Sequence, residues 1–183
     1  MEPKELIAGY RQAHTHPVFA TMIGNSIQRH TNEFMNFCNA YKPKSILDYG
    51  CGKGWQWTKK KLHLEAKVPM PTLYDPGVPG LENKPTGTFH SVLCTDVMEH
   101  VHQEECDETL KEIFSYAEHS VFFTISCNPA KKHFPDGTNY HVNCKPEEWW
   151  FATIKRLKPK HLKVWLIFPS FKGIIKYDKE EEA

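Results

Sequence analysis

The hydrophobic positions of this chain fall into helix-spaced sets separated by short apolar runs. Helical spacing predicts amphipathic helices over residues 26–41 and 102–118, and another helix beginning in "KPEEWWFATIKRL", with Pro146 at its first position. We also expect a helix over "WQWTKKKLHL", directly after a glycine-rich stretch. Residues 1–24 are polar and are predicted to be irregular.

Short apolar runs predict the strands. Four buried strands are expected within "SILDYG", "PTLYDPG", "HSVLCTD" and "SVFFTIS". The segment "HLKVWLIFPSFKGIIKYD" alternates with period two and predicts a terminal antiparallel pair. Because strands alternate with helices, the chain is expected to be an α/β protein with a mostly parallel sheet and helices on both faces. Ligands of such sheets bind beyond the carboxyl ends of the strands.

Length and composition fit one domain over residues 1–183, with a flexible acidic tail at 178–183. The formal net charge of +1 gives no overall field for a polyanion, so nucleic acid is not an expected partner. No apolar stretch approaches a membrane span, and no signal-peptide core is present. Six cysteines without a CxxC pair favour a reducing, cytoplasmic setting.

The stretch "ILDYGCGKGW" places three glycines on alternate positions directly after an expected strand. Glycine accepts positive φ and leaves no Cβ in the way of a ligand. A phosphate-binding loop would need Gly-Lys followed by Ser or Thr, and a dinucleotide fingerprint would need a glycine where this chain has a tryptophan. What remains is Asp48-x-Gly50-x-Gly52-x-Gly54. The structural alternative is a strand-to-helix turn with a capping aspartate.

This arrangement resembles the first motif of class I S-adenosylmethionine-dependent methyltransferases, which have a Rossmann-like fold. The resemblance implies that the glycine turn approaches the methionine part of the cofactor. An aspartate and backbone carbonyls would hold its amino group, and amide N–H groups its carboxylate. The residues implied are Asp48, Tyr49, Gly50, Cys51, Gly52 and Gly54.

Two further segments support the resemblance. Asp75, followed by Pro76, ends the next expected strand at the distance suited to an acid that accepts hydrogen bonds from both ribose hydroxyls. An Asp before Pro is otherwise a common turn former.

The segment "SVLCTDVMEHV" resembles the family's fourth-strand motif, with methionine in place of leucine at position 98. Cys94, Thr95, Asp96 and Val97 would then lie along the adenine side of the pocket. His100 would lie near the sulfonium, although a histidine at a helix start is often a cap or a packing residue.

The resemblance extends over most of the chain to small bacterial and phage methyltransferase-like proteins. The shared segments are "LDYGCGKGWQW", "YDPGVPG", "TDVMEHV" and "HFPDGTNYHVNCKPEEWW". One departure is that too little chain separates Asp75 from His90 for the family's usual strand and helix. We therefore expect a trimmed sheet edge after the second strand.

Candidate catalytic groups lie in the loop "FPDGTNYHVN". Methyl transfer needs a nucleophile held in line and, for a hydroxyl or protonated amine, a base. We take Asp136, His141 and His100 as candidates, with Asn139 beside them. An Asp-Gly turn with polar neighbours is the alternative, and the adjacent Trp149–Trp150 pair either walls the acceptor pocket or packs the helix on the sheet.

The two HxH pairs, His14 with His16 and His100 with His102, lack a carboxylate or cysteine cluster in sequence, so no metal is expected. Residues 1–25, including "HTHPVF", are a candidate lid over the cofactor. The basic segment "KRLKPKHLK" is interpreted as a solvated helix end, with contact to nucleic acid as the alternative.

The sequence thus predicts transfer of a methyl group from S-adenosylmethionine to an unidentified small-molecule acceptor. The Asn/Asp-Pro-Pro-Tyr and Pro-Cys signatures of DNA methyltransferases are absent, and no target-recognition domain is visible. Two alternatives stay open, namely a protein that binds S-adenosylmethionine without methyl transfer and an enzyme that degrades it. The oligomeric state is not indicated.

Overall fold

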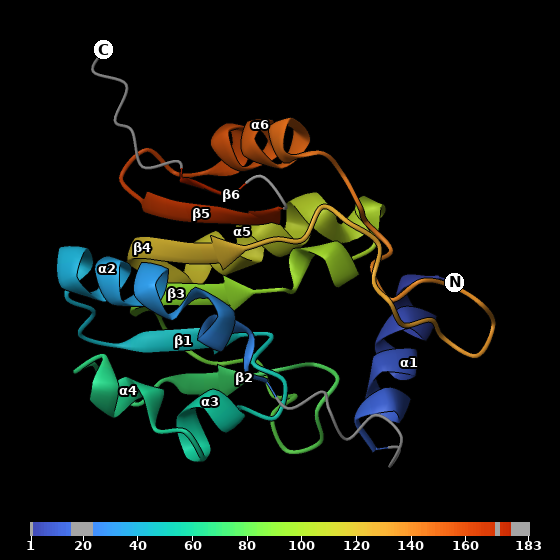
Figure 1. Ribbon diagram of the computed structural model, residues 1–183, viewed down its shortest axis with the longest axis horizontal. Helices are drawn as coiled ribbons and strands as arrows, with labels where there is room; N and C mark the ends of the chain where they lie inside the picture. The colour runs from blue at the N-terminus through green and yellow to red at the C-terminus, as the bar shows by residue number, and fades with distance from the viewer. Residues whose placement is uncertain (1, 16–23, 171–172, 177–183) are drawn as a thin grey trace.

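The computed structural model describes residues 2–15, 24–170 and 173–176. Its centre is a six-stranded sheet in the order β2-β1-β3-β4-β5-β6 (Figure 1). Five strands are parallel, and β6 runs antiparallel to β5 at the edge. The predicted α/β architecture and the terminal antiparallel pair are therefore confirmed.

The strands are short, and those in the middle of the sheet are buried. They are β1 Ile46–Tyr49, β2 Thr72–Tyr74, β3 Phe89–Thr95, β4 Ala117–Thr124, β5 Lys163–Ser170 and β6 Gly173–Lys176. Strands buried on both faces are typically continuous hydrophobic runs, which explains why "SVFFT" and "SVLCT" carry so few charges.

Helices cover the sheet and its carboxyl edge. They are α1 Pro3–Thr15, η2 Ser26–His30, α2 Thr31–Tyr41, α3 Trp55–Thr58, α4 Leu62–Glu65, η3 Met98–His100, η4 Gln103–Glu105, α5 Cys106–Tyr116 and α6 Glu147–Leu157. Those labelled η are 3₁₀ helices. No helix in the described ranges is long and apolar enough to cross a membrane.

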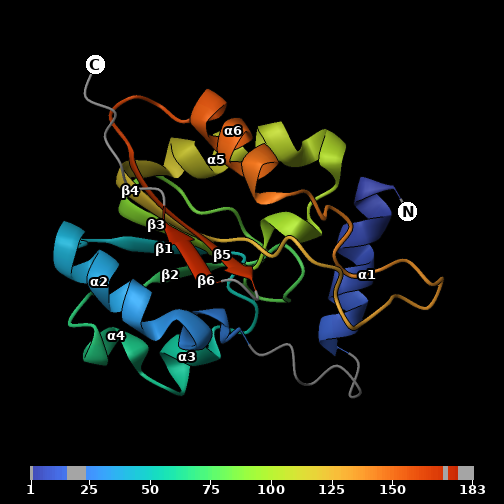
Figure 2. The same ribbon diagram turned by 45° about the horizontal axis from the view of Figure 1, so that its top comes forward.

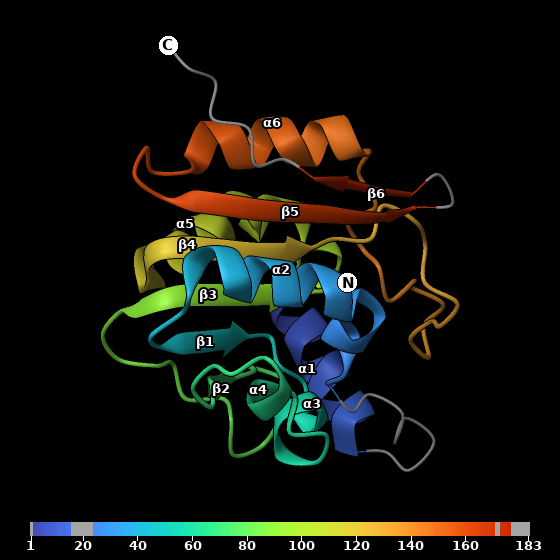
Figure 3. The same cartoon turned by 60° about the vertical axis from the view of Figure 1, so that its left-hand side comes forward.

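The sheet has a hydrophobic core on each face. Helices α5 and α6 lie on one face, and α2, α3 and α4 lie on the other (Figures 2 and 3). Leu110, Ile113 and Trp150 pack against the first face. Phe34 and Trp57 pack against the second. The alternating side chains of each central strand supply both cores.

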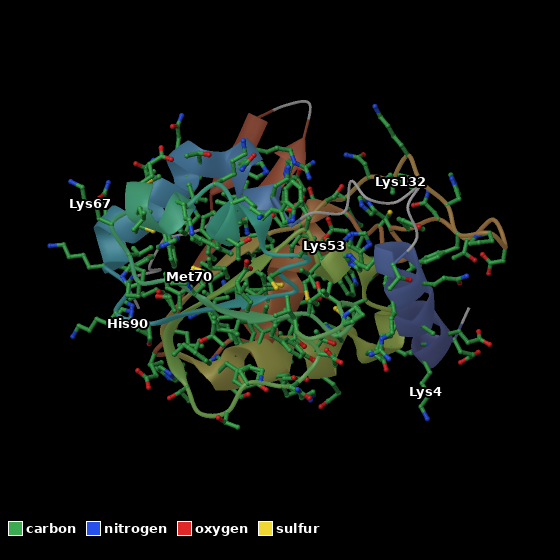
Figure 4. All side chains as sticks on the ribbon, turned by 90° about the horizontal axis from the view of Figure 1, so that it is seen from below. Lys4, Lys53, Lys67, Met70, His90 and Lys132 are labelled. Carbon is green, nitrogen blue, oxygen red and sulfur yellow. The ribbon has the colours of Figure 1, made fainter. Side chains whose placement is uncertain are left out.

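Helix α1 lies beyond the carboxyl ends of the parallel strands, next to the long loop between β4 and α6 (Figures 1 and 2). Figure 4 shows Lys53 of the glycine-rich turn on this side of the molecule, together with Lys4 of α1 and Lys132 of the long loop. His90 and Met70 lie on the opposite side. The segments expected to bind a ligand are thus collected at one edge of the sheet.

The prediction that residues 1–24 are irregular was wrong where the structure describes them, because Pro3–Thr15 form a helix. Leu6 and Ala13 are buried on it, and they pack with Phe134 and Tyr140 of the long loop. Since the partners come from so far along the chain, this packing stabilises a helix with a weak local signal.

Three helix predictions need correction in their bounds. The helix over 26–41 begins as the 3₁₀ turn η2 before α2. The helix expected over "WQWTKKKLHL" is two short helices, because Lys61 adopts a left-handed φ of 56° between them. The helix over 102–118 ends at Tyr116, and Ala117 already belongs to β4.

The trimmed edge after the second strand is confirmed. Residues 75–88 form turns and no strand, so β2 is the last strand on that side. The chain crosses directly from the end of β2 to β3, leaving the loop after Asp75 close to the glycine-rich turn.

Candidate active site

The glycine turn between β1 and α3 is held in a conformation that favours glycine. Gly50, Gly52 and Gly54 all have positive φ, at 77°, 55° and 60°. The N–H groups of Gly50 and Cys51 donate to the carbonyl of Tyr74 at 2.8 and 3.1 Å. The turn is therefore tied to the end of β2, and its shape does not depend on a ligand.

Gly50 also makes room for the neighbouring strand end. A Cβ built on Gly50 would lie 2.3 Å from Cγ2 of Val97, which is closer than carbon atoms can approach. A side chain at this position would push Val97 and the turn after β3 away from the glycine turn. The glycine thus allows two of the three predicted binding segments to touch.

This close approach predicts that Gly50→Ala destabilises the protein by about 1–3 kcal/mol more than Gly87→Ala, because overpacking adds to backbone strain. Gly87 is a matched control, since its φ is 78° and nothing lies within 4 Å of its built Cβ. The free energy of unfolding in urea would measure both losses. Equal losses would contradict the steric role of Val97.

Asp48 at the end of β1 is fully buried and partly engaged by the chain itself. Its Oδ2 accepts hydrogen bonds from Nε1 of Trp57 at 2.5 Å and from Nε2 of Gln56 at 3.1 Å. Its Oδ1 has no hydrogen-bond partner among the described residues. Burial raises the pKa of Asp48 to about 6, opposed by the two hydrogen bonds.

Asp75 at the end of β2 joins two loops. Its Oδ2 accepts from the N–H of Gly52 at 2.7 Å, and its Oδ1 accepts from the N–H of Gly77 at 2.8 Å. The next residue, Pro76, accepts a hydrogen bond from Nη2 of Arg11 on α1 at 3.0 Å. This carboxylate therefore fixes the glycine turn relative to the loop that follows β2.

Asp96 at the end of β3 adopts a positive φ of 54°, an uncommon conformation for a residue other than glycine. Its Oδ1 accepts from Oγ1 of Thr124 at 2.8 Å, and its Oδ2 pairs with Arg29 of η2 at 3.0 Å. Such strained residues cluster at functional sites. The strand end is held in place from both β4 and η2.

Glu99, His100 and His141 form a cluster of possible metal ligands at the same edge. One atom from each side chain, a carboxylate oxygen or an imidazole nitrogen, lies within 4.8 Å of the others. The rings of His100 and His141 meet edge to face with centroids 4.8 Å apart. Burial, reinforced by His141, lowers the pKa of His100 to about 4, so this imidazole is neutral at pH 7.

Helix α1 closes over this cluster. The hydroxyl of Tyr10 donates to the carbonyl of Tyr140 at 2.6 Å and lies 3.0 Å from Nδ1 of His100. A Cβ built on Gly77 would lie 3.4 Å from Tyr10 and 3.5 Å from His14, so the same helix face also covers the loop after Asp75.

A family model described as a methyltransferase domain matches residues 25–165, well over half of the chain. The chain belongs to the methyltransferase-domain family. No curated protein matches it in a sequence search. The matched range of the methyltransferase domain includes the glycine turn, Asp75, Asp96 and the Glu99–His100–His141 cluster, and it begins after α1.

The structure brings together most of the binding residues expected from the methyltransferase sequence. The parallel strands β2, β1 and β3 lie side by side in the sheet. At or next to their carboxyl ends they carry Asp75, Asp48 and Asp96, respectively. The side chains of Tyr49 and Cys51 are buried, so these residues offer the site their backbone atoms. Two more of the expected residues, Cys94 and Thr95, are also buried in β3.

Among the candidate catalytic residues, His100 and His141 meet, but Asp136 is engaged elsewhere. The carboxylate of Asp136 is exposed and accepts from the N–H of Thr138 at 2.9 Å, in a turn where Gly137 has a φ of 86°. This matches the structural alternative of an Asp-Gly turn. Its hydrogen bond to Thr138 also lowers the pKa of Asp136.

The other candidates of the methyltransferase domain have structural roles. Trp150 is fully buried in the core under α6, and Trp149 packs partly buried beside it. Nδ1 of His102 accepts from the N–H of Glu104 at 3.5 Å at the start of η4. His16 lies outside the described residues.

Sequence reasoning missed Glu99 and Tyr10. Glu99 lies within the segment "TDVMEHV", but nothing in the sequence links its carboxylate to His141. Tyr10 lies in the segment expected to be irregular. Its spacing from Leu6 and Ala13, four and three residues, is helical and would have been the available signal.

Proposed function

We propose that this methyltransferase binds S-adenosylmethionine at the carboxyl edge of its sheet and transfers the methyl group to a small-molecule acceptor. The observation that carries the proposal is the convergence of the glycine turn, Asp75 and Asp96 at this edge. These segments are distant in sequence but are tied together by the hydrogen bond from the N–H of Gly52 to Asp75 and by the close approach of Gly50 to Val97.

The unpartnered oxygen of Asp48 fits the amino group of the methionine moiety. A buried carboxylate oxygen without a hydrogen bond costs free energy, which a bound ammonium group would recover. In the glycine turn that follows, the backbone can approach the ligand closely. Asp48 would thus serve both the chain, through Oδ2, and the ligand, through Oδ1.

Asp75 fits the ribose. Each of its oxygens accepts one backbone N–H, and a carboxylate oxygen has a second lone pair for a hydroxyl donor. The two N–H bonds hold the carboxylate rigidly in place, which lowers the entropy cost of binding a diol.

The cofactor supplies an electrophilic methyl group when it is bound, and the residues of this chain position the reactants. In-line transfer depends on holding the nucleophile against the methyl carbon and excluding water. Tyr10 and His14 of α1 lie over the loop after Asp75, and Tyr10 also contacts His100. We infer that α1 acts as the cover that the sequence predicted for residues 1–25.

A small acceptor agrees with the formal net charge of +1, which gives no overall field for a polyanion. The segment "SCNPA" shares only Asn-Pro with the signature of amino-methylating DNA enzymes. These features support a metabolite-sized acceptor over a nucleic acid.

The proposal predicts that S-adenosylmethionine and S-adenosylhomocysteine both stabilise the protein against heat. At a ligand concentration one hundred times the dissociation constant, the gain is about 2.7 kcal/mol. NADH and ATP should give much smaller shifts in melting temperature, because the glycine turn lacks both of their fingerprints. Equal shifts with NADH would contradict the cofactor assignment.

A further inference from the structure

The Glu99–His100–His141 cluster combines two parts of the chain that are far apart in sequence. Glu99 and His100 belong to η3, directly after Asp96 and the end of β3. His141 comes from the long loop before α6, and the N–H of Asn143 in that loop donates to the carbonyl of Glu99 at 3.0 Å. The loop is thus pinned so that His141 faces His100.

Both histidines are oriented in the way that metal-binding histidines usually are. Nδ1 of His100 lies 2.9 Å from the carbonyl of Tyr140, and Nδ1 of His141 lies 2.6 Å from the carbonyl of Asn128. A carbonyl oxygen only accepts, so each Nδ1 carries the proton and each Nε2 of a neutral ring keeps a free lone pair. An Nδ1–H bonded to a backbone carbonyl is the common outer-shell arrangement of a ligand histidine.

Glu99 supplies a carboxylate oxygen that has no protein partner in the described ranges. The side chain is fully buried, its Oε1 accepts from the N–H of Ser126 at 3.1 Å, and its Oε2 forms no hydrogen bond. Burying such an oxygen is unfavourable unless a donor or a cation meets it. In the described part of the chain the neighbouring imidazoles form no salt bridge with Glu99, so a cation would be the group that completes this cluster.

We propose that Glu99, His100 and His141 bind a divalent transition-metal ion. Two imidazoles and one carboxylate are the donor set of open zinc sites and of related Mn²⁺, Co²⁺ and Fe²⁺ sites. Mg²⁺ and Ca²⁺ prefer oxygen ligands, so they fit this cluster less well. Three protein ligands leave at least one coordination position for an exogenous oxygen.

The role of the metal rests on the proposed function. A hydroxyl group of the acceptor bound to the ion has a lowered pKa and loses its proton to water. Its oxygen then forms a bond to the methyl carbon while the carbon–sulfur bond of the cofactor breaks, and the electron pair stays on sulfur. The products are the methylated acceptor and S-adenosylhomocysteine. The histidines thus act as ligands, in place of the base role expected from the sequence.

The experiment titrates the full chain, first stripped with a chelator, with Zn²⁺ alone and follows binding by calorimetry. We expect one Zn²⁺ ion per chain and little binding of Mg²⁺. Glu99→Gln and His141→Ala should each weaken Zn²⁺ binding by at least about 10–100-fold, since even outer-shell losses have that effect. His102→Ala is the matched control, because it removes a nearby histidine outside the cluster, and it should bind Zn²⁺ like the wild type.

Absence of Zn²⁺ binding by the wild-type chain, or a loss in His102→Ala equal to that in His141→Ala, would overturn the proposal. If a variant fails to fold, the visible spectrum of the wild-type chain with Co²⁺ tests whether the metal site exists. Intense bands of four- or five-coordinate Co²⁺ support the site, and the weak spectrum of the hydrated ion contradicts it. Binding of S-adenosylhomocysteine is measured in a separate titration. This titration tests the cofactor site independently of the metal site.

Discussion

Replacing Asp75 with alanine is expected to weaken the binding of S-adenosylhomocysteine by about 3–6 kcal/mol, the contribution of two hydrogen bonds to a charged group at about 1.5–3 kcal/mol each. The ribose diol would donate both bonds to the carboxylate at the end of β2. The alanine variant also releases the N–H groups of Gly52 and Gly77, so the glycine turn loses its attachment to the following loop.

The same variant should lose less in folding than in binding. One of the released N–H groups, that of Gly52, is only partly buried and can bond to water, so the free energy of unfolding should fall by about 1–3 kcal/mol. Calorimetric titration and urea unfolding would measure the two losses. Asp107→Ala serves as the control, because Asp107 of α5 pairs with Arg156 of α6, and both helices lie on the sheet face opposite α3 (Figure 2). A folded Asp75→Ala protein with wild-type affinity would contradict the ribose assignment.

Replacing Asp48 with alanine is expected to destabilise the protein by about 2–6 kcal/mol, because two buried hydrogen-bond donors lose their acceptor at a cost of about 1–3 kcal/mol each. The Nε1–H of Trp57 and the Nε2–H of Gln56 would be left without their acceptor. Gln56 also accepts from the N–H of Ile27 at 3.2 Å, so the damage should spread to η2. Asp48→Asn keeps an acceptor oxygen and should retain most of the stability.

The pH dependence of Asp48→Asn tests the buried charge itself. Burial raises the folded-state pKa of Asp48 to about 6, above an unfolded value of about 3.9, so the native state keeps its proton to higher pH. The contribution of the Asp48 carboxyl group to the free energy of unfolding is therefore greatest below about pH 4 and falls as the pH rises to about 6. The stability of Asp48→Asn relative to the wild type should rise by about 1–3 kcal/mol between pH 4 and pH 7.

Asp136→Asn serves as the control, because its stability relative to the wild type should change with pH in the opposite direction. A hydrogen bond from Thr138 lowers the pKa of Asp136, so its ionised form stabilises the native state above the unfolded pKa. Replacing this carboxylate should therefore lower the free energy of unfolding of the variant, relative to that of the wild type, as the pH rises. Urea unfolding at both pH values would measure the two series, and a flat difference for Asp48→Asn would contradict a raised pKa.

The sheet could be predicted from the sequence because its signals are local. Parallel strands buried on both faces are continuous apolar runs, and "SILDYG" and "HSVLCTD" have no competing helical period. The short distance from Asp75 to His90 likewise left no room for another strand, and the structure has none there. The ends of the strands, and with them the glycine turn, Asp75 and Asp96, followed from this pattern.

The parts that could not be predicted depend on contacts between distant segments. Helix α1 is stabilised by packing on Phe134 and Tyr140, more than one hundred residues away in sequence. The break at Lys61 depends on a left-handed backbone conformation that lysine rarely adopts. The break at Lys61 has no periodic signal, and α1 shows only the short helical spacing of Leu6, Tyr10 and Ala13.

The sequence indicated His100 and His141 as catalytic candidates, but their contact with each other and with Glu99 could not be predicted, for the same reason. His141 is forty-one positions after His100, and only the fold of the long loop brings their rings together. The HxH spacing of His100 and His102 was a weak metal signal, and His102 instead caps η4. Carboxylate and imidazole ligands from separate loops can be recognised only after the sheet has aligned its strand ends.

A crystal structure of the full chain with bound S-adenosylhomocysteine would show directly whether the carboxyl edge of the sheet is the cofactor site. We expect the amino group of the ligand at Asp48 or the carbonyls of the glycine turn, and both ribose hydroxyls at Asp75. The sulfur atom should face the Glu99–His100–His141 cluster beneath α1. A ligand bound away from the carboxyl edge of the sheet, or with its ribose turned away from Asp75, would contradict this binding site.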